Sequence, residues 1–215
     1  MSAENLDDFL ASQPSSVHRS ARKLARTARQ AYPIGVPALI MKSNTDRLTT
    51  SSGYSFILGT PDDLLRRLAS WLLTNAVESQ AILLILIKKL WKRHGREDIA
   101  LASILLANID HSVLSIEPWV TFENIIHKKE PLDGLLLCIE ELLRAEHQLP
   151  STDLYLDWLE SDSINNYLAI LICHAGMVRG VLPEKEVIKQ IELVEIPGGD
   201  SILSRIKSRL IEKIA

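Results

Sequence analysis

The stretch LLILIKKLWKRHGREDIALASILLANID, from Leu83 to Asp110, decides the fold class of this 215-residue chain. It joins an apolar run to a basic cluster, one glycine and a second segment in which apolar residues return every three or four positions. That spacing is typical of an amphipathic helix. We therefore expect two antiparallel helices joined by a tight turn with a basic rim, and we expect Gly95 to be the left-handed residue that ends the first helix.

The apolar run 81–87 has no polar side, which is typical of an inner helix covered by its neighbours. Lys88 and Lys89 follow at once, whereas crossing a bilayer takes about 20 apolar residues. The N-terminal stretch MSAENLDDFLASQ carries acids where a secretory signal has basic residues. We expect a soluble, cytoplasmic protein that does not bind membranes.

The rest of the chain also follows a helical pattern. Apolar residues recur at helical spacing almost everywhere after residue 60, and no stretch alternates convincingly over the length of a strand. Proline, Ser, Thr or Asp marks most of the expected helix starts. The predicted helices span 62–76, 78–94, 96–109, 117–127, 132–147, 152–159, 163–178, 184–195 and 201–214.

Consecutive predicted helices form pairs that recur at roughly 35 to 40 residues, the range of HEAT-like units. We expect an all-α fold, a right-handed α-α superhelix of HEAT-like pairs; a non-repetitive helical bundle is the alternative. The chain 1–215 is predicted to be one domain. It would comprise an N-terminal helical pair (1–31), a loop-rich join (32–60) that is polar and rich in turn formers, and the HEAT-like array (61–215).

Charge is distributed unevenly along the chain. Residues 1–96 hold 14 Lys and Arg against 7 Asp and Glu, residues 97–200 hold 6 against 19, and residues 201–215 hold 4 against 1. The three segments therefore carry +7, −13 and +3, which sum to the net charge of −3. Such asymmetry indicates a charged partner on one part of the surface.

The clearest basic pattern is SVHRSARKLARTARQAYP, residues 16–33. On one helix its cations share a face, and small apolar residues lie opposite. The basic face comprises Arg19, Arg22, Lys23, Arg26 and Arg29; the apolar face comprises Val17, Ala21, Leu24, Ala25 and Ala28. Three interpretations remain open: a solvated surface, a site for nucleic-acid phosphates, or docking on the acidic half of the chain itself.

A second basic cluster ends the predicted helix 78–94 and comprises Lys88, Lys89, Lys92 and Arg93. Cations there also complement the helix dipole, which explains part of the cluster without any ligand. Backbone phosphate contact without base reading is what both clusters could support. The candidate partners are therefore the DNA backbone and, alternatively, a basic protein that binds the acidic residues within 97–200.

Two stretches resemble the HEAT-like DNA alkylation repair family. LWKRHGREDIALASILLANI, residues 90–109, is similar to its segment in which a Leu-Trp pair ends one helix and an acidic turn opens the next. YPIGVPALIM, residues 32–41, looks like its aromatic-Pro-Gly-Val-Pro stretch. The resemblance, over roughly residues 17–175, implies a basic groove for the DNA backbone. It also implies aromatic and acidic residues that stabilise a cationic sugar as an alkylated base departs.

The catalytic pattern that the resemblance implies is incomplete. Asp133 in HKKEPLDGLLL is the one candidate acid, but it has no adjacent Trp, and Leu136 stands where a second acid is expected. SINNY, residues 163–167, lacks the later Trp of the family. We therefore expect nucleic-acid binding without glycosylase activity. The histidine and cysteine spacings match no metal site and no cofactor motif is present, so we expect neither a metal nor a cofactor.

Overall fold

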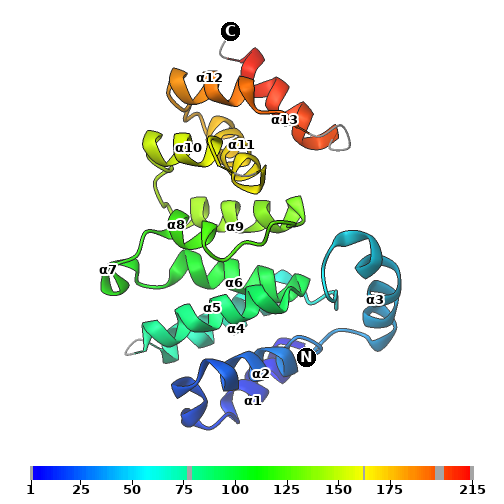
Figure 1. The fold of residues 1–215 in the computed structure, drawn as a ribbon. Helices are drawn as coiled ribbons and strands as arrows, with labels where there is room; N and C mark the ends of the chain where they lie inside the picture. The colour runs from blue at the N-terminus through cyan, green and yellow to red at the C-terminus, as the bar shows by residue number, and fades with distance from the viewer. Residues whose placement is uncertain (1, 77–78, 162, 197–200, 214–215) are drawn as a thin grey trace. The chain divides into compact units, whose positions relative to one another are not determined.

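The computed structural model describes residues 2–76, 79–161, 163–196 and 201–213, and every regular element among them is helical (Figure 1). These residues form 13 α-helices and one 3₁₀ helix, with no β-strand. The all-α fold that the sequence predicts is confirmed. In this part of the chain no helix has the length and apolar character needed to cross a bilayer.

The chain, expected to form one all-helical domain, divides by its internal contacts into two compact units. Unit 1 comprises Met1–Ile126 and Pro131–Ala145, and unit 2 comprises His127–Glu130 and Glu146–Ala215. The helices of unit 1 are α1 (Ser2–Ala11), the 3₁₀ helix η1 (Ser15–Arg19), α2 (Ala21–Ala31), α3 (Ala38–Ser52), α4 (Asp62–Asn75), α5 (Gln80–Arg93), α6 (Arg96–Asn108), α7 (His111–Leu114), α8 (Pro118–Glu123) and α9 (Leu132–Arg144). Those of unit 2 are α10 (Thr152–Leu159), α11 (Ser163–Val178), α12 (Lys185–Leu193) and α13 (Ser201–Glu212).

The nine predicted helices are all present, and each begins within two residues of its predicted start. Local signals explain this agreement. Pro61 and Pro131 directly precede α4 and α9, and the hydroxyl of Ser151 accepts a hydrogen bond from the Leu154 N–H at the start of α10. Such residues satisfy or remove the free N–H groups of a first helical turn.

Helix α6 is the centre of unit 1. Every residue from Glu97 to Ala107 is buried, and α6 packs against α4, α5 and α9. The expectation that the run 81–87 is the inner helix is wrong, because Ala81 and Ile85 of α5 are exposed. Small side chains along α6 let neighbouring helices approach it from several sides, whereas α5 is apolar but covered on one side only.

Helix packing departs from the predicted pairs. The principal contacts of unit 1 join α5 to α6, α6 to α9, α2 to α5, and α4 to α6. Those of unit 2 join α11 to α13 and α10 to α11. The expected pairs of α4 with α5 and of α11 with α12 are not among them. The physical reason is that α6 and α11 are buried along most of their length and therefore contact helices further along the chain.

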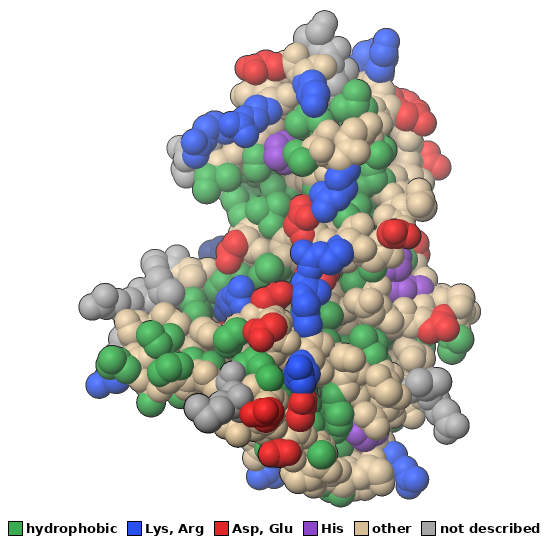
Figure 2. Space-filling view, turned by 180° about the vertical axis from the view of Figure 1, so that it is seen from behind, with side chains coloured by type: hydrophobic (Ala, Val, Ile, Leu, Met, Phe, Trp, Pro, Cys, Tyr) green, Lys and Arg blue, Asp and Glu red, His purple; other side chains and the backbone are tan. Residues whose placement is uncertain are grey.

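The predicted loop-rich join contains a helix, α3, in place of an open loop. Its turn-forming residues lie at its ends: Pro37 precedes its first turn, and Gly53 ends it with a positive φ of 81°. Glycine adopts this left-handed conformation without steric cost. Leu39 and Ile40 on α3 are 78% and 46% exposed, and hydrophobic side chains gather on the left-hand part of the surface in Figure 2.

Candidate functional site

The basic helix of the N-terminal region begins later than the sequence predicts. Residues 15–19 form the 3₁₀ helix η1, and Ser20 is extended with φ −149° and ψ 112°. Its hydroxyl accepts a hydrogen bond from the Lys23 N–H and so caps α2. Serine is favoured at this position because it satisfies a free N–H of the first turn. Arg19 therefore precedes the helix and does not belong to the basic face of α2.

From Ala21 onward the two predicted faces of α2 are correct. The small apolar residues of the helix are buried, and Leu24 and Ala28 are almost inaccessible to solvent. The exposed side chains on α2 include all of its cations, namely Arg22, Lys23, Arg26 and Arg29. Burial of the apolar face against α5 thus holds the basic side of α2 at the surface.

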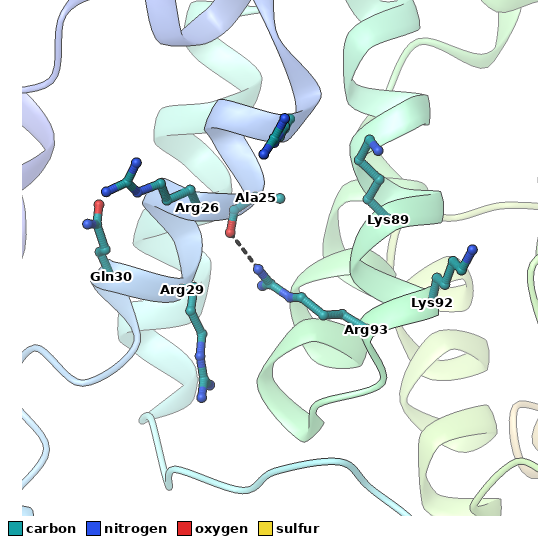
Figure 3. A pocket seen from close by; sticks show the side chains of 8 residues that line it. Ala25, Arg26, Arg29, Gln30, Lys89, Lys92 and Arg93 are labelled. Atoms are coloured by element: carbon teal, nitrogen blue, oxygen red, sulfur yellow. Dashed lines mark hydrogen bonds between the residues drawn. The ribbon is translucent and has the colours of Figure 1, made fainter.

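A groove of about 610 Å³ lies between α2 and α5 (Figure 3). We call it the α2–α5 groove, and it is lined by Arg22, Ala25, Arg26, Arg29, Gln30, Lys89, Lys92 and Arg93. Figure 3 shows Arg26 and Arg29 extending from α2, and Lys89 and Lys92 extending from α5. Two segments about 60 residues apart in the sequence therefore bring six of the nine predicted basic residues to one groove. The structure places Arg19, Lys23 and Lys88 outside it.

Five of the six cations in the groove carry uncompensated charge. Within the described residues, no carboxylate forms an ion pair with Arg22, Arg26, Arg29, Lys89 or Lys92. The lining includes no Asp or Glu. Like charges around one concave surface reinforce one another and raise the local concentration of anions. The arrangement can therefore bind a polyanion.

Arg93 has a different role, because Asp98 already compensates its charge. The Arg93 Nε donates to Asp98 Oδ2 at 2.7 Å, a second bond joins its Nη2 to Oδ1, and Nη1 donates to the Ala25 carbonyl at 2.7 Å. The last bond crosses the groove from α5 to α2 (Figure 3). Burial alone would lower the pKa of Arg93, but its hydrogen bonds to Asp98 and the charge of that residue raise it. Arg93 therefore fixes the spacing of the two walls.

Asp98 is fully buried and also accepts a hydrogen bond from the Tyr32 hydroxyl at 2.8 Å. Burial, followed by the charge of Asp98, raises the pKa of Tyr32 well above 10.0. The carboxylate of Asp98 thus has a cation on one side and a neutral donor on the other, which is how a buried charge is tolerated. Through it, the end of α2 and the end of α5 are tied to the start of α6.

The turn between α5 and α6 corrects one prediction. His94 is the left-handed residue, with φ 61°, whereas Gly95 is extended with φ −77° and ψ 153°. Histidine is among the residues that enter the left-handed region more often than most. Glycine is required at position 95 for another reason: a Cβ atom there would lie 1.9 Å from Cζ of Phe56.

Asp133, the candidate acid, lies in the first turn of α9 and is exposed. Its Oδ2 accepts a hydrogen bond of 2.8 Å from the hydroxyl of the buried Tyr54. It is not among the residues that line the α2–α5 groove. Asp133 therefore connects α9 to the segment before α4, and its catalytic role stays a prediction.

Several residues of the site were not found from the sequence. Gln30 lines the groove, Phe56 lies beside it, and the acid that positions Arg93 is Asp98. Only the five-residue spacing of Arg93 and Asp98 across Gly95 was a local signal, since a tight turn brings such residues together. Phe56 had no local signal, because its partners are distant in sequence.

Comparison with known proteins adds no assignment. No protein-family model matches the sequence, and searches of curated proteins and of solved structures give no match. The resemblance to DNA alkylation repair proteins stays a prediction.

Proposed function

We propose that this chain is a cytoplasmic HEAT-like protein, a right-handed α-α superhelix, that binds the phosphate backbone of DNA through the α2–α5 groove. One observation supports the proposal most strongly: two helices place five unpaired cations around one groove that has no acid in its lining. Contacts to phosphates fix a protein on nucleic acid without reading its sequence. No acid has been located at the groove, so we propose binding without glycosylase activity.

The test removes three groove cations from both walls in the variant Arg22→Gln/Arg26→Gln/Lys89→Gln. Fluorescence anisotropy would measure the affinity for two duplexes of unrelated sequence over a series of salt concentrations. Each lost phosphate contact lowers the slope of log affinity against log salt by about 0.9, so three contacts lower it by about 2.7. The loss of affinity should be equal for both duplexes, because phosphates carry no base information.

The matched control is Arg19→Gln/Lys23→Gln/Lys88→Gln. It removes the same charge from exposed neighbours of the groove that do not line it. We expect the control to change the slope by less than one unit. Equal slopes for the groove and control variants would show that only the overall charge matters, and absence of wild-type binding at low salt would refute the proposal.

A second candidate function is a scaffold that binds a basic protein. The observation that favours it lies in unit 2, where Asp153 and Asp157 share one exposed side of α10 and the exposed Glu160 follows. No Lys or Arg occurs between Glu146 and Glu160 to neutralise them. This candidate becomes the better account if wild-type protein fails to bind DNA but binds a polylysine peptide in a salt-dependent way. Replacing these three acids with Asn and Gln should then weaken peptide binding.

A further inference from the structure

Arg29 differs from the other groove cations because an aromatic ring supports it. Its Cζ lies 3.7 Å from the centroid of the Phe56 ring. A guanidinium that stacks on an aromatic face keeps its N–H donors free at the edge of its plane. No such ring contact is recorded for Arg22 or Arg26 among the described residues. Arg29 is therefore the most ordered of the unpaired cations on α2.

The ring of Phe56 is held in place from two directions. The backbone on both sides of it bonds to the α5–α6 turn, with Ser55 N donating to the His94 carbonyl at 2.8 Å and Arg96 N donating to the Phe56 carbonyl at 2.9 Å. The para carbon of the ring faces the bare Cα of Gly95. A side chain at position 95 would therefore push the ring away from its present place.

The segment that follows Phe56 is also anchored. The fully buried Glu97 accepts hydrogen bonds through Oε1 from the N–H groups of Leu58 and Gly59, at 2.9 and 2.8 Å. A carboxylate that accepts several backbone N–H groups holds a loop firmly. Phe56 thus belongs to a rigid segment although it lies in a connection between helices.

We propose that Phe56 is a positioning residue of the α2–α5 groove, which orients Arg29 for phosphate binding without touching the phosphate itself. The inference rests on the proposed DNA-binding function. An exposed arginine loses rotamer freedom when it binds, and an arginine already held in its bound orientation loses less. Phe56 is not among the groove-lining residues, so its effect on affinity must pass through Arg29.

The test is a double-mutant cycle measured by DNA binding. Phe56→Leu keeps an apolar side chain and the net charge but removes the ring face. We expect it to weaken binding about two- to fivefold, the range of an exposed cation–π contact. The same substitution should have almost no effect in an Arg29→Gln background and its full effect in an Arg22→Gln background, because only Arg29 depends on the ring.

Gly95→Ala provides a second route, since it displaces the ring without altering Phe56. It should reproduce the loss of affinity, again only when Arg29 is present, and circular dichroism would verify that each variant remains folded. An equal effect of Phe56→Leu in the Arg29→Gln and Arg22→Gln backgrounds would overturn the inference, as would unchanged affinity of both Phe56→Leu and Gly95→Ala. Those results leave wild-type binding intact, whereas loss of the proposed function itself would appear as no wild-type binding.

Discussion

Replacing Asp98 with asparagine tests how the walls of the α2–α5 groove are held. Asp98 is 0% exposed and binds both Arg93 and Tyr32. Asparagine has nearly the same shape but no charge, and its amide N–H₂ would face the donors of Arg93 or Tyr32. Removing one partner of a buried ion pair costs about 3–5 kcal/mol, because it leaves an uncompensated charge.

The lower end of that range applies here. The Arg93 side chain is 32% exposed, so water can compensate part of the charge that Asp98 no longer neutralises. We therefore expect Asp98→Asn to lower the free energy of unfolding by about 3 kcal/mol. For a chain of this size, each kcal/mol corresponds to about 2–4 °C in melting temperature, which gives a decrease of about 6–12 °C.

Thermal and urea denaturation at neutral pH, followed by circular dichroism, would measure this change. The matched control is Asp63→Asn, the same substitution at an exposed position in the first turn of α4. It should cost less than about 1 kcal/mol, the contribution of one carboxylate near a helix N-terminus. A melting temperature of Asp98→Asn within about 2 °C of wild type would refute the reasoning.

Two predictions concern pH. Burial lowers the pKa of His18 below 6.5, so the unfolded chain binds that proton more strongly and stability present above pH 6.5 is lost as the pH falls. His18→Phe, which keeps an aromatic ring beside Trp71, should reduce this loss in melting curves between about pH 7.5 and 5.5; an unchanged dependence would exclude His18. The raised pKa of Tyr32 has the opposite consequence: stability is present below pH 10.0 and declines above it. Urea midpoints between about pH 9 and 11 should fall less steeply in Tyr32→Phe, and equal slopes would contradict the assignment.

The helices themselves followed from the sequence because their signals are local. Apolar residues that recur every three or four positions predict a helix wherever it packs, and a proline or serine marks its first turn. The predicted bounds 152–159 and 163–178 match α10 and α11. Where local signals competed, the prediction was wrong: Ser20 could continue a helix or cap one, and in the structure it caps α2.

The candidate site was predictable only in part, for the same reason. Helical periodicity places Arg22, Arg26 and Arg29 on one side of α2, and the structure confirms that side as the groove wall. No local signal indicates that Lys89 and Lys92 lie opposite them. That fact depends on the packing of α2 against α5, which are about 60 residues apart.

The sequence by itself determined which residues are helical and which faces are basic, because both depend on neighbours within one or two turns. Only the tertiary structure decided that α6 is the buried centre of unit 1, that Arg93 is neutralised by Asp98, and that Phe56 supports Arg29. These relations need side chains from separate segments to meet. Such meetings follow from how whole helices bury their apolar surface against one another, and the spacing of residues along a single helix does not contain that information.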